Sequence, residues 1–183
     1  DDLTALSTFF SKCDVITYES ENVLTAPFHA LGVQDRVIPP LTVLETVQDR
    51  IREKTFLSRN NLPHVAFRAL KDIADLPKVV DTFGYPFIVK SARGGYDGKG
   101  QYPINNLENL DSIDIDYSKG YILEKLVKLK KEISIIITRF SDYKYEIYEP
   151  IENVHENQIL INSKIPAEIS NKILEQSKLW ATQ

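Results

Sequence analysis

Residues 84–104 read GYPFIVKSARGGYDGKGQYPI and contain most of the chain's glycines. Four of the chain's seven glycines lie within residues 94–100, between an apolar run that ends at Lys90 and a short run that begins at Gln101. The β-branched and aromatic residues on both sides predict two strands, and glycine permits the tight connection between them. We therefore expect a glycine-rich hairpin within an antiparallel sheet.

This glycine loop matches neither of two common phosphate-binding motifs. The Walker motif requires Gly-Lys followed by Ser or Thr and a helix, whereas here Lys99 is followed by Gly100 and a predicted strand. The dinucleotide fingerprint requires a following helix and another glycine spacing. Two interpretations remain: backbone N–H groups, with Lys90 and Lys99, could contact phosphate oxygens, or the loop is a hairpin tip without a ligand.

Helical patterns dominate the chain before Gly84. We predict helices over residues 3–10, 41–61 and 75–83, and a short strand over residues 15–17. Such a helix-and-strand step is common in nucleotide-binding folds.

The middle helix carries the clearest start signal. Thr42 and Glu45 fit a capping box, and the apolar spacing predicts that Leu44, Val47 and Ile51 are buried.

Segments typical of strands dominate after Gly84. They are YPFIVK, QYPI, GYILEKLV, EISIIITRF and YKYEIYEPI, and a final helical pattern places Ile169, Ile173, Leu174 and Trp180 on one face. The predicted fold class is α/β or α+β, in which a helical segment precedes a β-rich lobe with an antiparallel sheet.

The composition narrows the function classes. A formal net charge of -4 and a pI near 5.4 argue against nucleic-acid binding, and no apolar run is long enough to cross a membrane. The single cysteine suits a reducing compartment, so we expect a cytoplasmic protein. The cysteine and the three histidines lack zinc-ligand spacing. The absence of Met and the helical pattern at the end of the chain indicate an internal piece of a longer protein.

Four polar residues are candidates for a site, each with a plainer alternative. Lys90 could contact phosphate or face solvent at a strand end. Glu124 and Glu132 could serve acid–base chemistry, ribose hydroxyls or a metal, or form a solvated sheet edge. His155, flanked by two asparagines, could act in a site or be structural.

Five blocks together resemble one family. CDVITYESENV, QDRIREKTFL, GYPFIVKSARGGYDGKGQ, ILEKLVKLKKEISIIITR and IENVHENQIL occur in the order and approximate spacing found in the ATP-dependent carboxyaminoimidazole ribonucleotide synthetases of purine biosynthesis, which are ATP-grasp ligases. The resemblance covers almost the whole chain. It implies an ATP-grasp fold, with a remnant of an N-terminal nucleotide-fold domain at 1–44, an incomplete ATP-grasp domain at 45–183 and a lid lobe at about 84–127.

The resemblance also implies roles for particular residues. Arg50 and Lys90 would contact the nucleotide phosphates, Glu124 the adenine, Glu132 the ribose hydroxyls, and His155 a further nucleotide position. The flap over ATP would consist of Gly95, Tyr96, Asp97, Gly98, Lys99, Gly100 and Gln101, and the adenine linker of Glu124, Lys125, Leu126 and Val127.

The family's reaction joins bicarbonate to the amine of aminoimidazole ribonucleotide while ATP becomes ADP and phosphate. A carboxyphosphate intermediate is implied, as are Mg²⁺ and a homodimer. The magnesium-binding carboxylates are expected downstream of this chain, so we predict that residues 1–183 alone do not catalyse the reaction. The resemblance identifies no catalytic residue within the chain.

Two positions depart from the family pattern. Ser20 stands where the family usually has Phe, and Tyr148 is followed by Glu149 before Pro150 instead of directly by Pro. The contribution of Glu19 or Glu21 to substrate binding therefore stays open. Alternatives are another ATP-grasp ligase, such as a purine transformylase or a biotin-carboxylase-like enzyme, and a non-catalytic nucleotide-binding module.

Overall fold

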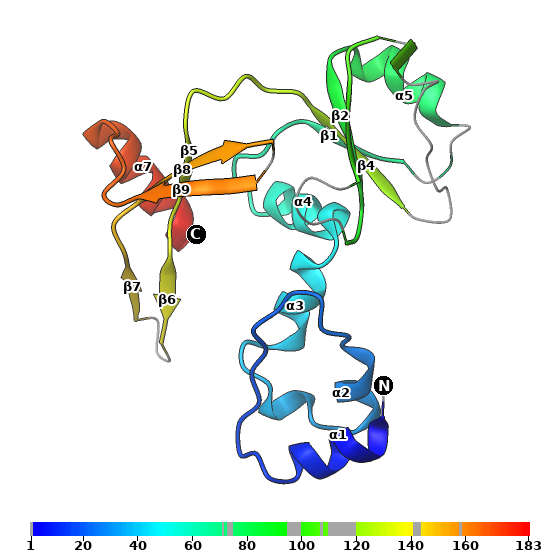
Figure 1. Cartoon of the computed structure of the whole chain (residues 1–183), viewed down its shortest axis with the longest axis vertical. Helices are drawn as coiled ribbons and strands as arrows, with labels where there is room; N and C mark the ends of the chain where they lie inside the picture. The colour runs from blue at the N-terminus through cyan, green and yellow to red at the C-terminus, as the bar shows by residue number, and fades with distance from the viewer. Residues whose placement is uncertain are drawn as a thin grey trace.

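A computed structural model of the chain describes residues 2–70, 72, 75–94, 100–106, 108–109, 120–140, 144–157 and 159–183. Three regions follow one another along the sequence (Figure 1): a helical N-terminal part, a central sheet with helices on either side, and a C-terminal part of short strands with a last helix. None of the helices in these described ranges is both long and apolar enough to span a lipid bilayer.

The N-terminal part has its own hydrophobic core. Helix α1 (Leu3–Phe10) starts at Asp2, whose carboxylate accepts the N–H groups of the first turn, and α2 (Ala26–Ala30) and a 3-10 turn (Gln34–Arg36) follow. The core contains Phe10, Ile16, Phe28, Val33, Val37, Leu41 and Leu44. Because this core ends at Leu44, we keep the domain boundary after residue 44 as a proposal.

The prediction of a strand over residues 15–17 is wrong in its length. Ile16 and Val37 form one isolated parallel bridge, and only Ile16 is buried there, since Val15 lies exposed beside it. A single apolar side chain that enters the core does not require a longer ladder.

The predicted middle helix is in fact two helices. Helix α3 (Leu41–Val47) starts after Pro40 without a side-chain cap, and α4 (Arg50–Arg59) starts at Asp49. The capping box is wrong because Thr42 already lies inside α3 and its carbonyl accepts a bond from Thr46.

Asp49 makes the break between these helices. Its Oδ1 accepts the N–H groups of Ile51 and Arg52, which begins a new helix, and Val47 before it is 46% exposed, against the predicted burial.

Removing this cap should be measurable. Asp49→Ala is expected to lower the free energy of unfolding by about 1–2 kcal/mol, because two helix N–H groups lose their acceptor. Asp49→Asn keeps an acceptor at the cap and should cost about half as much or less. Urea denaturation of the two variants checks this, and equal losses would argue that the cap contributes nothing.

The central sheet has the strand order β1-β4-β2-β3, and its pairs are antiparallel. The strands are β1 (Phe67–Leu70), β2 (Phe87–Ser91), β3 (Gln101–Ile104) and β4 (Tyr121–Lys125). The predicted hairpin is confirmed, since β2 pairs with β3 across the glycine loop. β1 was not expected from the sequence.

The two faces of this sheet have different roles. Helix α5 (Leu76–Phe83), which ends at Gly84 as predicted, covers one face. The core between them consists of Leu76 of α5 and, from the strands, Leu70, Phe87, Val89, Ile104, Tyr121 and Leu123. Because side chains alternate along a strand, Lys90 and Glu124 lie on the opposite face, toward α4 (Figure 1).

The C-terminal part contains two further small sheets and a helix. β5 (Glu132–Ser134), β8 (Ile151–Glu156) and β9 (Ile159–Lys164) form one sheet, and β6 (Ile137–Arg139) pairs with β7 (Tyr145–Ile147). The segment EISIIITRF is therefore two strands in different sheets, not one. Helix α7 (Asn171–Thr182) starts at Ser170, and its apolar Ile173 and Trp180 are partly exposed.

Both departures from the family pattern are accommodated locally. The Ser20 hydroxyl accepts the N–H of Asn22 and so forms a short polar turn. Pro150 is fully buried, whereas Tyr148 is exposed and its N–H bonds the carbonyl of Ile136.

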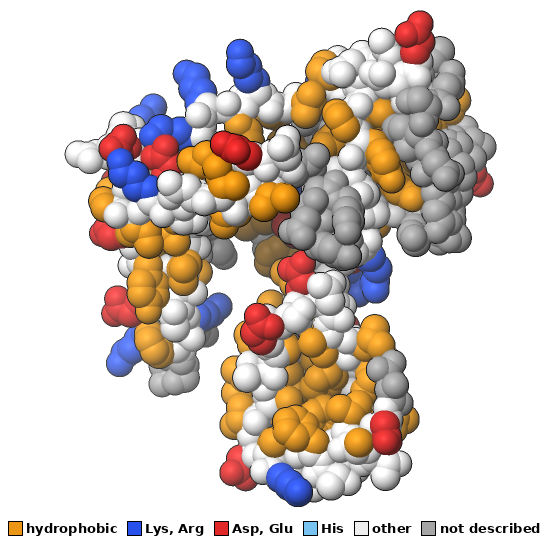
Figure 2. Space-filling model, viewed as in Figure 1, with side chains coloured by type: hydrophobic (Ala, Val, Ile, Leu, Met, Phe, Trp, Pro, Cys, Tyr) orange, Lys and Arg blue, Asp and Glu red, His pale blue; other side chains and the backbone are white. Residues whose placement is uncertain are grey.

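Apolar side chains gather on the surface of the N-terminal part in Figure 2. Phe9, Val15 and Leu24 are each more than half exposed, and Phe9 and Leu24 line a cleft with the buried Phe10 and Ile16.

Candidate functional site

Three charged side chains meet on the α4 face of the central sheet. Lys90 Nζ on β2 lies 2.7 Å from Glu124 Oε2 on β4, and Lys54 Nζ on α4 lies 3.5 Å from Glu124 Oε1. Glu124 is only 5% exposed, and both lysines are partly buried. One carboxylate is thus held between two ammonium groups, one from the sheet and one from the helix.

These contacts set the protonation state of Glu124. Burial alone would raise the pKa of its carboxyl, but the hydrogen bond and charge of Lys90, followed by those of Lys54, outweigh burial and lower the pKa. Glu124 is therefore ionised at neutral pH, and the three groups together carry a net charge of about +1. That charge suits an anionic ligand beside them.

Lys54 is the site residue that the sequence prediction missed. It lies four residues after Arg50, so the two share one face of α4. The spacing of Arg50 and Lys54 within QDRIREK could have indicated that both side chains face the same way. The sequence could not show that this helix packs against the sheet.

Arg50 contacts the start of the glycine loop. Its backbone N–H bonds the carbonyl of Ala92, and its guanidinium donates to the carbonyls of Ser91 and Gly94 at 2.8 and 2.7 Å. Arg93 Nε lies 3.0 Å from Asp49 Oδ2. The first turn of α4 thereby fixes the backbone at the entrance of the loop.

Of the predicted flap, Gly95, Tyr96, Asp97, Gly98 and Lys99 lie outside the described residues. Gly100 and Gln101 are described, and Gln101 pairs with Lys90 at the start of β3. Gly94 and Gly100, which flank the loop, both have a positive φ (65° and 74°) that favours glycine.

Gly100 also lies close to its neighbour. A Cβ at this position would lie 2.9 Å from Ser91 Oγ. Gly100→Ala is expected to lower the free energy of unfolding by about 1–2 kcal/mol from its backbone conformation alone, with the contact adding to it.

Two matched alanine variants separate these effects in thermal denaturation. Gly32 has a similar φ of 64° and open space, whereas Gly120 has no positive φ and an ordinary 3.5 Å contact. We expect the order of loss to be Gly100, then Gly32, then Gly120. A Gly100 variant as stable as the Gly120 variant would contradict this assignment.

The predicted adenine linker continues from Glu124 into Lys125, which is the last residue of β4. Its side chain points to the α5 face, where Nζ donates to the carbonyls of Gly84 and Tyr85 at 3.2 and 3.1 Å. Its backbone N–H bonds the carbonyl of Ala66. The Lys125 ammonium therefore ties the linker to the end of α5.

The following Leu126 and Val127 are exposed, and the backbone N–H of Leu126 bonds the carbonyl of Pro86.

Glu132 and His155 form a second group, on the sheet of β5 and β8. Glu132 Oε2 lies 3.5 Å from His155 Nδ1. The structure thus brings Lys90 and Glu124 together on one sheet, and Glu132 and His155 together on another.

A small cleft of about 170 Å³ lies beside the loop entrance. Its lining combines Glu21 and Asn22 of the first sequence block with Arg50 and Gly94; Val47, Gln48 and Glu53 complete it. The Gln48 amide donates to the carbonyl of Glu21, which holds that block against α3. Glu21 is thereby placed near the loop, and Glu19 is not among the lining residues.

We tested whether these residues suit a metal ion. In the part of the chain that the structure describes, no three His, Cys, Asp or Glu side chains converge on one point. The described residues therefore do not form a site that would hold Mg²⁺ by protein oxygen ligands alone.

A family model for the ATP-grasp domain matches residues 55–183, which is more than half of the chain and includes Lys90, Glu124, Glu132 and His155. The chain belongs to the ATP-grasp family. The ATP-grasp fold implied by the sequence resemblance is confirmed, and Arg50 and Lys54 lie just before the matched residues.

Individual proteins and solved structures are also similar to this chain. The N5-carboxyaminoimidazole ribonucleotide synthase of Staphylococcus aureus (strain MRSA252) is 39% identical over 176 residues, which are 96% of this chain and 47% of that protein. A solved ADP complex of purK, an N5-carboxyaminoimidazole ribonucleotide synthetase, superimposes with a TM-score of 0.91 at 30% identity over 99% of this chain and 48% of that one. The ADP complex of the Staphylococcus aureus synthetase gives a TM-score of 0.89 at 36% identity, over 100% and 49%. The chain spans about half the length of these ATP-grasp relatives.

Proposed function

We propose that the full-length protein is an ATP-dependent carbon–nitrogen ligase that carboxylates aminoimidazole ribonucleotide with bicarbonate in purine biosynthesis. The observation that carries this proposal is the contact of Glu124 with Lys90 and Lys54, in which Lys90 and Glu124 lie within the matched ATP-grasp domain and Lys54 directly before it. The names of the relatives, and the ADP bound in two of their structures, support the choice of reaction and nucleotide.

In this proposal the chain binds ATP along the α4 face of the sheet and the linker. Glu124 and the backbone of Lys125, Leu126 and Val127 contact adenine, and Lys90 contacts phosphate. The buried Lys54 gives this arrangement a physical basis, because it keeps Glu124 ionised when the Lys90 ammonium turns from Glu124 to a phosphate oxygen.

The remaining contacts follow the predicted roles. Glu132 accepts from the ribose hydroxyls and His155 contacts the nucleotide beside it, while Arg50 acts at the phosphate end. We propose that Arg50 acts there by holding the loop entrance, because its guanidinium already bonds two backbone carbonyls. Residues 95–101 remain proposed as the flap.

The chemistry needs positioning and charge neutralisation more than a covalent residue. A bicarbonate oxygen bonds to the γ-phosphorus while the bond from that phosphorus to the β–γ bridging oxygen breaks, giving carboxyphosphate and ADP. The amine nitrogen of aminoimidazole ribonucleotide then bonds to the carboxyl carbon as the carbon–oxygen bond to phosphate breaks, and the nitrogen loses a proton. Excluding water protects carboxyphosphate from hydrolysis.

The acceptor's path is proposed through the cleft at Glu21, Arg50 and Gly94, since it opens beside the loop entrance. Homodimerisation and a cytoplasmic location complete the proposal, and inactivity of residues 1–183 alone remains a prediction.

ADP release tests the reaction. The full-length protein is mixed with ATP, Mg²⁺ and bicarbonate, with and without aminoimidazole ribonucleotide. We expect ADP release to depend on the ribonucleotide, and phosphate to carry one labelled oxygen when ¹⁸O-bicarbonate is used. Nucleotide binding with no response to the ribonucleotide would indicate another ATP-grasp ligase. Binding without any turnover would favour a non-catalytic nucleotide-binding module.

A further inference from the structure

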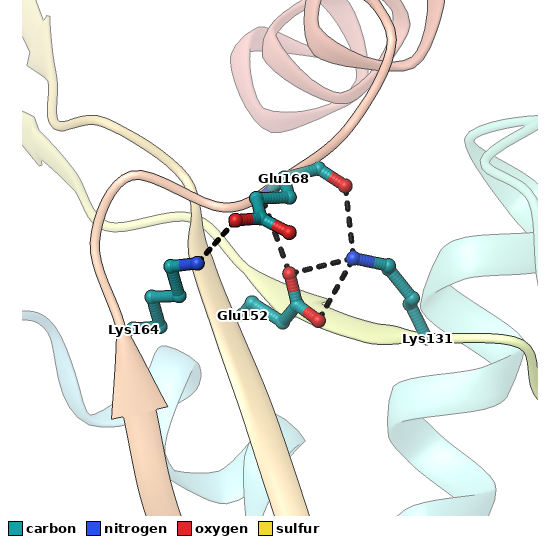
Figure 3. Close-up of polar contacts among 4 residues, drawn as sticks. All are labelled: Lys131, Glu152, Lys164 and Glu168. Carbon is teal, nitrogen blue, oxygen red and sulfur yellow. Dashed lines mark hydrogen bonds and ion pairs between the residues drawn. The ribbon is translucent and has the colours of Figure 1, made fainter.

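A charged network lies at the start of β5 (Figure 3). Lys131 Nζ donates to both carboxylate oxygens of Glu152, at 2.9 and 2.8 Å, and to the backbone carbonyl of Glu168 at 2.9 Å. Glu152 Oε2 also accepts the backbone N–H of Glu168 at 3.1 Å. Lys164 pairs with the Glu168 carboxylate at the edge of the network.

Glu152 is the centre of this network. Its side chain is 19% exposed, compared with 71% for Glu168 and 56% for Lys164, so the Lys131–Glu152 contact is the most protected of the pairs. The contacts of Lys131, Glu152 and Glu168 join three separate segments: the residue directly before β5, strand β8, and the turn before α7. Lys164 adds the end of β9.

The network lies on the opposite face of its sheet from the candidate ligand residues. Ile133, Glu152 and Lys164 are aligned across β5, β8 and β9, and so are Glu132, Asn153 and Ser163. Side chains of neighbouring positions point to opposite faces, so Glu152 lies behind the face that holds Glu132 and His155.

The face in front has its own polar contacts. The Asn153 amide donates to Ser134 Oγ, and its carbonyl oxygen accepts from Ser163 Oγ. Glu132 is therefore the first residue of a strand that is held on both faces.

We propose that Lys131 and Glu152 are positioning residues for the ribose of the bound nucleotide, acting through Glu132. This inference rests on the proposed function, in which Glu132 accepts from the ribose hydroxyls. β5 is only three residues long, so few ladder bonds hold its first residue. Lys131 is covalently next to Glu132, and its three hydrogen bonds fix the backbone from which the Glu132 carboxylate extends.

The test compares ATP with 2′,3′-dideoxy-ATP, which lacks the hydroxyls that Glu132 would bind. Dissociation constants are measured by calorimetry on the full-length protein and on Lys131→Met, Glu152→Gln and Lys130→Met. Lys130 is the matched control, because it is an exposed neighbouring lysine outside the network. Thermal denaturation establishes that each variant is folded.

We expect Lys131→Met and Glu152→Gln to weaken ATP binding by about 3–10-fold and to leave dideoxy-ATP binding unchanged. Lys130→Met should change neither. Combining Lys131→Met with Glu132→Gln should add nothing to the loss caused by Glu132→Gln alone.

Three results would overturn the inference: no loss for ATP, an equal loss for both nucleotides, or full additivity with Glu132→Gln. If one variant fails to fold, the other carries the same comparison. Failure of the proposed function is distinct, since the unmodified protein would then bind no ATP or would not distinguish it from the dideoxy analogue.

Discussion

Glu124→Gln is expected to lower the free energy of unfolding by about 2–4 kcal/mol, because it removes the negative charge that lies between two partly buried lysines. Glutamine keeps the size of the side chain, so the loss reports mainly on charge. Lys90 and Lys54 would be left beside each other without a compensating negative charge.

Urea denaturation measures this loss, with Glu146→Gln on β7 as the control. Glu146 is exposed and should change stability by about 0.5 kcal/mol or less. A Glu124 variant as stable as the Glu146 variant would show that the buried group contributes no net stability.

The lowered pKa of Glu124 also predicts that stability depends on pH. Because the folded pKa of Glu124 is lowered from 4.5, its contribution is fully present above pH 4.5 and is lost as the pH falls through the lowered pKa. The unmodified protein should therefore lose stability more steeply than Glu124→Gln on acidification below pH 4.5. Parallel pH profiles would contradict an ionised Glu124 in the folded protein.

Phe87→Ala is expected to cost about 3–5 kcal/mol of stability. Phe87 has no exposed surface, its ring stacks on Tyr85 at 5.4 Å between centroids, and Phe83 of α5 meets it edge-on at 6.3 Å. The alanine variant would leave a cavity under α5 that the strands cannot close.

Thermal denaturation with Phe56→Ala as the control tests this estimate. Phe56 on α4 is 52% exposed, so its truncation removes the same atoms from a half-solvated position and should cost clearly less. Equal losses for the two variants would contradict the core assigned to the central sheet.

The glycine hairpin and its neighbours were predictable because their signals are local. Two β-type runs around a glycine loop specify an antiparallel pair, and Gly84 ends α5 where the pattern placed it. Lys90 and Glu124 were both identified, although their mutual contact was not. Their meeting depends on the register of β2 against β4, which joins segments 34 residues apart.

The errors have physical causes as well. The apolar spacing continues through residues 41–61, which predicts one helix. The Asp49 side chain instead accepts backbone N–H groups and caps a new helix, so the chain forms two helices there. In EISIIITRF the residues between the two strands are themselves isoleucines, so the pattern could not show that the chain leaves one sheet for another between Ser134 and Ile137. Lys54 was missed because only tertiary packing brings α4 to the sheet.

The most direct test of the account is the structure of the full-length protein with ADP bound. We predict that adenine lies against Glu124 and the backbone of residues 125–127, with the phosphates at Lys90 and Lys54 still paired with Glu124. Adenine bound away from this linker, with the Lys90–Glu124 pair unchanged and remote from the phosphates, would contradict the account.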